Sequence, residues 1–327
     1  MAWLTDSMRP FEPDDLPAMY DLYVRSHQDF SGPLLSERMV RAMVCDPPST
    51  DAREAWVTSD LSGWYSLRAP LAENLHFTSI GPLVVDPRRQ REGIGRALFE
   101  HAIGRARALG RTTVVWETPD GMPGAKFSAA VGGTPALPET RSVLDLSGVG
   151  HFAELEREAA GHAAGYTVTH LPWPAPEELL PALVTLMEGM NDIPTGEIDF
   201  AATRWTTARY QEFQQRLHAK GVTFYITMAT HDATGEPAAF TMVAVDEDHG
   251  GWAKQQDTAV LRAHRGHRLG LLVKLANARW MREADPSLDR ILTWNADSNA
   301  HMLAINHAMG FRPLDQWATW QVVLTGR

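Results

Sequence analysis

The sequence lacks several features that would place the protein in a common class. It has a single cysteine, Cys45, so no disulfide can form within the chain, as is typical of a reducing compartment. No run of about 18 apolar residues occurs, which argues against a membrane-spanning helix. The first residues carry charges and no apolar signal core. We therefore expect a cytoplasmic protein that does not enter a membrane.

Positive charge is also scarce, because 40 acidic residues outnumber 30 basic ones. A protein that binds nucleic acid needs a basic face, so we expect no nucleic-acid partner. The 13 histidines show no His-Glu-x-x-His pattern and have no cysteine-rich companion, so we expect no metal. Cys45 ends a helical pattern without an evident base nearby, so we expect a packed thiol rather than a nucleophile.

A length of 327 residues is too large for one typical core and favours two domains. Two segments of strand, turn and helix resemble each other. The numbers of Val85 and Val260, which end the two strands, differ by 260 − 85 = 175, and those of Gly95 and Gly270 differ by the same amount. An equal offset at both places predicts a duplicated domain. We place the domains at 1–150 and 151–327, with a linking helix at 151–165.

The rest of each copy follows the order strand, helix, strand, helix, strand, which predicts an α/β fold with a mixed sheet. The helix after the first turn places Ile94, Leu98, Ala102 and Ala106 on one core-facing side. A last strand is expected to close each copy, at Ser142–Leu146 in the first and at Ala318–Leu324 in the second.

The turn between strand and helix has the composition of an anion site. Glycines let the backbone approach a ligand closely, and the first amides of a helix lack internal partners and can donate to phosphate oxygens. The first cradle comprises Gln90, Arg91, Glu92, Gly93, Ile94 and Gly95. The second cradle comprises Arg265, Gly266, His267, Arg268, Leu269 and Gly270.

These motifs resemble the GNAT acetyltransferases, which carry [Gln/Arg]-x-x-Gly-x-[Gly/Ala] between a strand and a helix. The first cradle matches that pattern fully, whereas the second has Arg268 in place of the first glycine. Asn299 and the Gly310-Phe311 pair match a downstream pattern of the family, but Asn306 stands where a tyrosine is common. The resemblance covers nearly the whole chain as two tandem GNAT-like acyl-CoA-binding domains, a layout similar to that of mycothiol synthase.

The resemblance implies acetyl-CoA as the donor and direct attack on its thioester by a small-molecule amine, in a monomer or homodimer. Backbone amides near the cradles would polarise the thioester carbonyl. They are those of Leu83, Val84 and Val85 in the first copy and Ala259, Val260 and Leu261 in the second. Asn299 would contribute to the same cofactor site.

An alkyl ammonium must lose a proton before it can attack, so a base is required. The carboxylates at strand ends are the candidates: Asp246 and Glu247, with Asp257 as a comparable choice, in the second copy, and Glu117 in the first. Asp192 could bind a substrate ammonium. The leaving thiolate needs a donor, for which Asn306 and Ser128 are candidate replacements of the missing tyrosine.

Two functions stay open at this point. The first is a CoA-dependent N-acyltransferase in which the second copy does the chemistry and the first binds CoA structurally or regulates. The second is a non-catalytic acyl-CoA-binding sensor or scaffold, motivated by the missing tyrosines.

Overall fold

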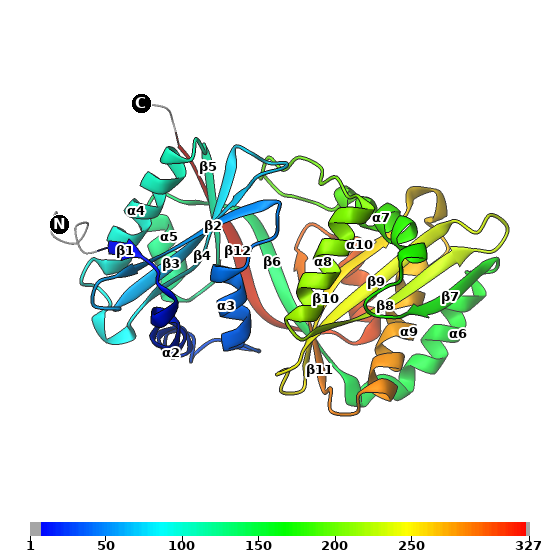
Figure 1. Ribbon diagram of the computed structural model, residues 1–327. Helices are drawn as coiled ribbons and strands as arrows, with labels where there is room; N and C mark the ends of the chain where they lie inside the picture. Colours follow the sequence, from blue (N-terminus) through cyan, green and yellow to red (C-terminus); the bar gives the residue numbers. More distant parts are fainter. Residues whose placement is uncertain (1–7, 325–327) are drawn as a thin grey trace. The chain divides into compact units, whose positions relative to one another are not determined.

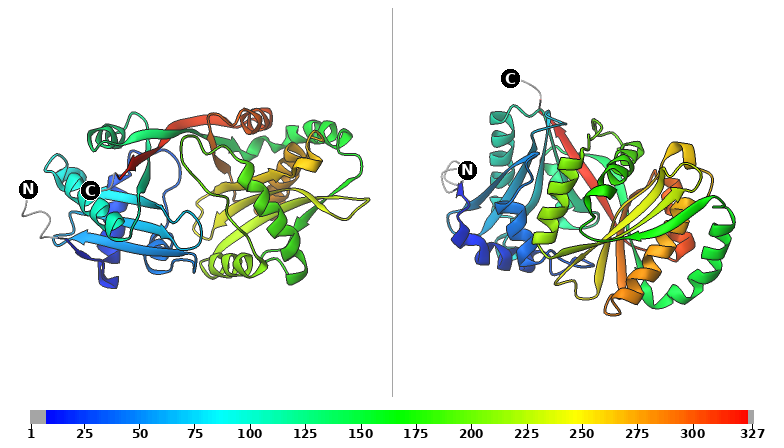
Figure 2. Two further views of the ribbon diagram at one scale, coloured as in Figure 1. Left: turned by 90° about the horizontal axis from the view of Figure 1, so that it is seen from above. Right: turned by 45° about the vertical axis from the view of Figure 1, so that its right-hand side comes forward.

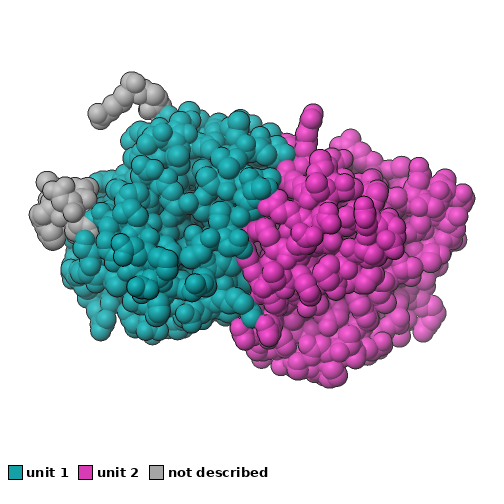
Figure 3. All heavy atoms as spheres, viewed as in Figure 1, with its two compact units in different colours: residues 1–138, 195–201, 316–327 teal, residues 139–194, 202–315 magenta. Residues whose placement is uncertain are grey.

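The computed structural model describes residues 8–324, which form two compact units (Figure 3). Unit 1 comprises the chain up to Pro138, the segment Thr195–Ala201 and the chain from Gln316 onward. Unit 2 comprises Glu139–Pro194 and Ala202–Asp315. The units therefore do not follow one cut in the chain, and the domain boundary near residue 150 stays a prediction.

Unit 1 contains a mixed sheet covered by helices (Figure 1). Its strands pair in the order β1 (Met8–Pro10), β2 (Asp51–Thr58), β3 (Gly63–Pro70), β4 (Phe77–Val85), β5 (Thr113–Pro119) and β12 (Arg312–Val323). Only the β4–β5 pair is parallel among these. The helices are α2 (Leu16–Ser26), α3 (Glu37–Cys45), α4 (Ile94–Ala108) and α5 (Pro123–Ala130), with a short 3-10 turn, η2 (Pro87–Arg89).

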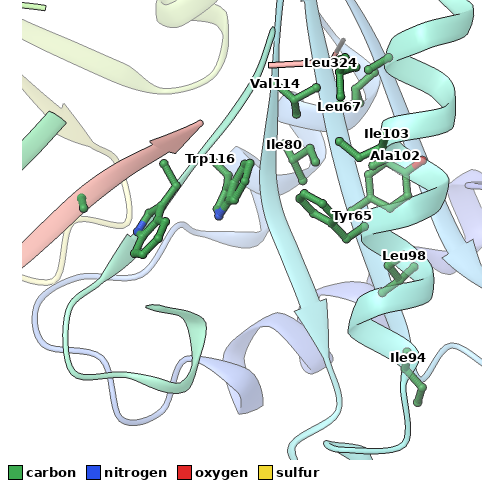
Figure 4. Close-up of a cluster of buried hydrophobic side chains, with 14 residues drawn as sticks. Tyr65, Leu67, Ile80, Ile94, Leu98, Ala102, Ile103, Val114, Trp116 and Leu324 are labelled. Carbon is green, nitrogen blue, oxygen red and sulfur yellow. The ribbon is translucent and has the colours of Figure 1, made fainter. Parts of the chain in front are cut away.

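The two faces of the unit 1 sheet carry alternate residues of each strand, as the pleat requires. Tyr65 and Ile80 pack against α4, whereas Trp64 packs against α2. Val84 also packs against α2, although it is four residues from Ile80, because β4 contains one extra residue between them. The predicted stripe on α4 is confirmed, because its four members are buried in the core beneath that helix (Figure 4). The first cradle thus joins a buried strand to a firmly packed helix.

Unit 2 repeats this arrangement in the second half of the chain (Figures 1 and 2). Its strands pair in the order β6 (Thr134–Asp145), β11 (Arg290–Ala296), β10 (Trp252–Val260), β9 (Pro237–Asp246), β8 (Val222–His231) and β7 (Tyr166–Leu171). The helices are α6 (Phe152–Gly161), α7 (Leu180–Glu188), α8 (Thr207–Ala219), α9 (Leu269–Ala284) and α10 (Ala300–Met309). Short 3-10 turns, η5 (Gly189–Asp192) and η6 (Arg262–His264), follow α7 and β10.

The closing strands are exchanged between the halves of the chain. In unit 1, β12 pairs with β5, with Thr319 opposite Glu117. In unit 2, the β6 residues 139–145 pair with β11, with Ser142 opposite Thr293. The expectation that each copy closes with its own last strand is therefore wrong. In a duplicated fold, the edges of β5 and β11 that accept a closing strand are alike. The sequence pattern of a strand therefore does not decide which of the two edges it joins.

Three further predictions, on Cys45, on membrane-spanning helices and on metal sites, can be compared with the structure of residues 8–324. Cys45 ends α3, but its side chain is exposed, so the expectation of a packed thiol is wrong. In the described part of the chain, no helix is both long and apolar enough to cross a membrane. No group of three or more His, Cys, Asp or Glu side chains there is arranged to hold a metal ion.

Candidate functional site

The parallel strand pair at the centre of each sheet diverges toward the cradle. In unit 1, β4 and β5 pair only where Phe77–Ser79 lies beside Thr113–Val115. In unit 2, β10 and β11 pair only where Trp252–Lys254 lies beside Arg290–Leu292. Each strand continues beyond the paired part, so a gap in the ladder, which we call the splay, opens before each cradle.

A bulge interrupts the strand that leads to each cradle. The register between β3 and β4 shifts so that Gly81 and Pro82 stand opposite one residue, Ser66. The register between β9 and β10 shifts in the same way at Gln256 and Asp257, which are the equivalent positions under the offset between the two copies. A bulge leaves its extra residue outside the ladder and redirects the backbone. The two bulges therefore present unladdered backbone at equivalent places beside the splay.

The first cradle bends through two residues with positive φ. Arg91 has φ 69° and Gly93 has φ 89°, after which α4 begins at Ile94. Arg89 is held by Glu92 at 3.0 Å and also by Asp60. Arg91 is exposed and has no ion-pair partner among the described residues, so it remains available to an anion.

The second cradle has the same backbone with its glycine at the other position. Gly266 has φ 89° and Arg268 has φ 53°, and these residues are the equivalents of Arg91 and Gly93 in the duplicated pattern. Left-handed backbone costs a residue with a Cβ roughly 1–2 kcal/mol, and glycine almost nothing. Each cradle thus has one arginine in the strained left-handed conformation. The replacement of the first glycine of the family pattern by Arg268 leaves the backbone conformation of the cradle unchanged.

Acidic side chains of unit 2 already neutralise the arginines around the second cradle. Asp192 accepts hydrogen bonds from Arg262 at 2.7 and 2.8 Å and from Arg265 at 2.8 Å. The bond from Arg262, with that from Arg265, lowers the pKa of Asp192 to about 2 despite some desolvation. Glu158 pairs with Arg268 at 2.5 Å. Asp192 is therefore engaged by guanidinium groups, and a substrate ammonium would have to compete with them.

A charged cavity of about 340 Å³ lies beside the first cradle in unit 1. Its lining includes three carboxylates and three guanidinium groups: Asp21, Asp60, Asp86, Arg25, Arg88 and Arg89. Asp86 accepts from Arg88 at 2.7 Å, and the hydrogen bonds from Arg88 hold the pKa of that carboxyl at about 2. The opposite charges largely cancel, so the cavity has no strong preference for either sign.

Most of the amides expected to polarise a carbonyl lie on strands that are paired along one edge and open to the splay along the other. Leu83, Val84 and Val85 stand opposite residues of β3, and Ala259 and Val260 stand opposite residues of β9. The amide of Leu261 donates to the carbonyl of Ala238 at 2.9 Å. Because alternate N–H groups of a strand point to opposite edges, some of these amides face the splay, and the bulges add unladdered backbone that the sequence analysis did not single out. The equal offset between the copies could have identified the equivalent bulge positions, because it aligns Gly81 and Pro82 with Gln256 and Asp257.

Asp257, in the bulge of unit 2, has the environment of a proton acceptor. Desolvation raises the pKa of its carboxyl to about 6, although the side chain keeps some solvent access. Tyr210 of α8 lies near enough that the Asp257 charge adds to the effect of burial in raising the pKa of the phenol. The Tyr210 hydroxyl is buried and has no hydrogen-bond partner among the described residues. Nothing in the local pattern of α8 distinguishes this tyrosine from a core residue, so sequence reasoning missed it.

Asn306 and Ser128, the candidate replacements for the missing tyrosine, are both buried but differ in which hydrogen-bonding atoms have no partner in the described part of the chain. In unit 2, Asn306 donates to Asn295 at 2.6 Å, and its amide oxygen is buried without a partner among residues 8–324. In unit 1, Ser128 donates to the carbonyl of Gly124 and accepts from the indole of Trp116 at 2.7 Å. Ser128 is therefore fully engaged, whereas Asn306 retains an acceptor for a ligand N–H or S–H group.

The structure separates the other candidates. Asp246 and Glu247 lie at the end of β9 beside the start of β10, which is the paired end of the strand and not the splayed end. Glu117 of unit 1 lies beyond the last β4–β5 pair; its side chain is exposed, although the surrounding protein desolvates the carboxyl enough to raise its pKa. Asn299 caps α10 by accepting from the amide of Met302. Of these residues, only Glu117 lies at a splay with the environment of a base.

Comparison with known proteins agrees with this geometry. Residues 16–127 match the acetyltransferase (GNAT) family. A tandem GNAT protein from the clavulanic acid biosynthesis pathway is 27% identical, with a TM-score of 0.78, over 98% of this chain and 99% of that one. A GCN5-related N-acetyltransferase from Sphaerobacter thermophilus shares the fold at 15% identity, with a TM-score of 0.67, over 98% and 96% of the two chains. No curated protein matches the sequence. The chain as a whole thus has the tandem GNAT fold, and its residues 16–127 are similar to the acetyltransferase (GNAT) family.

Proposed function

We propose that the protein transfers an acyl group from acyl-CoA to a small-molecule amine, and that unit 2 carries the reaction. Acetyl-CoA is the proposed donor, since the structure of the 27% identical tandem protein is identified as its form without AcCoA. The observation that carries the choice of unit is Asp257, a carboxyl with its pKa raised to about 6 in the bulge beside the splay.

The residues of both units fit a CoA molecule. Each cradle offers helix N-terminal amides behind a left-handed turn, and arginines lie beside both. In unit 2, the orphaned amide oxygen of Asn306 is an acceptor for a group entering the splay. The thioester of acyl-CoA would supply an activated acyl group there.

Asp257 performs the first proton transfer in this scheme. An amine with a pKa near 10.4 is about 1 part in 10³ to 10⁴ neutral at pH 7. The Asp257 carboxylate takes one proton from the ammonium and so exposes the nitrogen lone pair for attack on the acyl carbon. A pKa of about 6 leaves the carboxylate mostly ionised at pH 7 while keeping it a stronger base than an ordinary aspartate.

The alternative is a protein that binds acyl-CoA without catalysis. The feature that favours it is the second cradle, whose arginines are paired with Asp192 and Glu158. A cradle held this way could act as a sensor that opens when CoA binds.

One experiment separates the two functions. Release of free CoA thiol is measured with acetyl-CoA and a library of amines, and products are identified by mass spectrometry. A product with any amine, formed well above the rate of hydrolysis, rejects the binding-only function.

Two glycine variants then assign the unit. Gly270→Val places a branched side chain against Ile305 and Val260, which lie at 3.3 and 3.4 Å from an added Cβ, so these side chains must shift and transfer should fall. Gly93→Val disrupts the left-handed turn at φ 89° of the first cradle. Loss of turnover in Gly93→Val alone would reject unit 2 as the reacting unit.

A further inference from the structure

A buried lysine lies on the helix that follows the second cradle. Lys274 of α9 is 3% exposed, and burial lowers the pKa of its ammonium to about 7. Lysine is almost never fully buried unless it is paired with an opposite charge. Lys274 has no carboxylate partner among the described residues, so its presence in the core calls for an explanation.

Lys274 makes fewer contacts than its hydrogens allow. An ammonium has three donors, and Lys274 donates one hydrogen bond, to the side-chain oxygen of Gln255 at 2.8 Å. The ring of Phe311 lies 5.3 Å away and offers a cation–π contact. Two of the three carboxylates of α6, which packs on α9, are paired elsewhere, Glu156 with Arg279 and Glu158 with Arg268, and the third, Glu154, forms no ion pair with Lys274 in the described part of the chain. Two of the lysine donors are therefore left for another group.

The contact with Gln255 places the lysine at the bulge. Gln255 is the last residue of β10 before the register shift, and it directly follows the last residue paired with β11. Its amide group donates to the carbonyl of Met242 at 2.9 Å, which turns the amide oxygen toward Lys274. Lys274 thus reaches from α9 to the point where the splay begins.

We propose that Lys274 is the acid that protonates the thiolate leaving from CoA in unit 2. The assignment rests on the proposed function and fills the role for which Asn306 has no suitable proton. As the carbon–sulfur bond breaks, its electron pair stays on sulfur, and Lys274 gives one ammonium proton to that sulfur. The products are CoA thiol and a neutral lysine amine, which solvent reprotonates before the next turnover. Over the whole reaction the substrate ammonium loses two protons, one replacing that of Lys274 and one released to solvent.

The first unit has no counterpart to this lysine among its described residues. The equivalent position under the offset between the copies is Phe99, which packs edge-on against Trp116 at 5.1 Å between ring centres. An ammonium in the core is therefore a property of unit 2 and not of the shared fold.

The test uses CoA itself, so it does not depend on knowing the acceptor. The thiol of CoA bound to the full-length protein is titrated by the ultraviolet absorbance of its thiolate, with desulfo-CoA as the blank. An ammonium within about 4–6 Å lowers the pKa of a thiol by about 1–3 units. We expect one bound thiol to show this shift in the wild-type protein and to lose it in Lys274→Met. Lys254→Met is the matched control, because Lys254 is also desolvated but lies at the paired end of β10, and the shift should persist.

Three results would overturn the assignment. The first is a bound thiol in the wild-type protein that titrates like that of free CoA, which requires no variant to fold. The second is an unchanged shift in Lys274→Met. The third is binding of a single CoA that Gly93→Val abolishes and Gly270→Val does not. If the amine screen yields a product while the thiol shift is absent, the proposed function stands and only the role of Lys274 fails.

Discussion

Replacing Asp257 with asparagine should stabilise the fold while removing the proposed base. Burial raises the pKa of this carboxyl from its usual value near 4 to about 6 in the folded protein. A group whose folded pKa is raised favours folding below the unfolded pKa and loses that contribution as the pH rises through the folded value. At pH 7 the ionised carboxylate therefore costs about 3 kcal/mol, at about 1.36 kcal/mol per unit.

The neutral amide in the variant would carry no such cost. Asp257→Asn should raise the unfolding temperature at pH 7 by roughly 6–12 °C, since 1 kcal/mol shifts a domain of 150–250 residues by about 2–4 °C. The gain should fall to about 0.5 kcal/mol around pH 4, where the wild-type carboxyl is protonated in the folded state and about half protonated in the unfolded one. Calorimetry at the two pH values measures this difference, with Asp248→Asn in the exposed turn after β9 as the control.

The same variant tests the chemistry. With an amine found in the screen, wild-type kcat/KM should rise with pH through about 6 as Asp257 ionises. Asp257→Asn should lower kcat by about 10²–10⁴-fold and remove that limb of the profile. Equal unfolding temperatures at pH 7 would refute the desolvation argument, and a retained limb near pH 6 would refute the role as base.

Three further outcomes follow from the cradles and the strand exchange. Asp192→Asn should free Arg262 and Arg265 for phosphate and tighten CoA binding by unit 2, as measured by titration calorimetry; unchanged binding would show that the ion pairs do not restrain the cradle. Arg268→Gly should relieve about 1–2 kcal/mol of backbone strain against an exposed ion pair worth about 0–1 kcal/mol, so chemical denaturation should show equal or greater stability. A fragment ending at residue 150 lacks β12 and should fail to give a cooperative unfolding transition; a cooperative one would contradict the need for the exchanged strand.

The sequence was sufficient for the architecture because its patterns are local. A strand, a glycine-bearing turn and a helix with residues such as Leu98 and Ala102 on one side specify themselves within one short stretch of chain. The equal offset between the two strands and between the two turns then indicated the duplication without any tertiary information. The partner of a closing strand is a long-range choice between two similar edges, so β6 and β12 were assigned to the wrong sheets.

The residues of the candidate site also divide into those that local sequence predicts and those that only the packing of the fold defines. The cradle residues were recognisable because phosphate binding needs glycine and helix amides at fixed spacing. Proton-transfer groups are defined by desolvation, which depends on what packs around them. Asp257 therefore ranked no higher than Asp246 in the sequence, and Lys274 resembled any polar residue on an amphipathic helix.

The residues at the two bulges differ in a way that supports the proposal that only one of the two cradles serves the reaction. In unit 1 the position of Asp257 is held by Pro82, which has neither a carboxylate nor an amide N–H, and the position of Lys274 is held by Phe99. The first splay thus carries no titratable side chain at these two positions, although Glu117 lies beside it and its cradle matches the family pattern fully and exposes Arg91 to an anion. Conversely, unit 2 carries both groups but restrains its arginines with Asp192. In the proposed scheme, proton transfer therefore belongs to unit 2, and CoA retained by unit 1 would contribute to stability rather than to turnover.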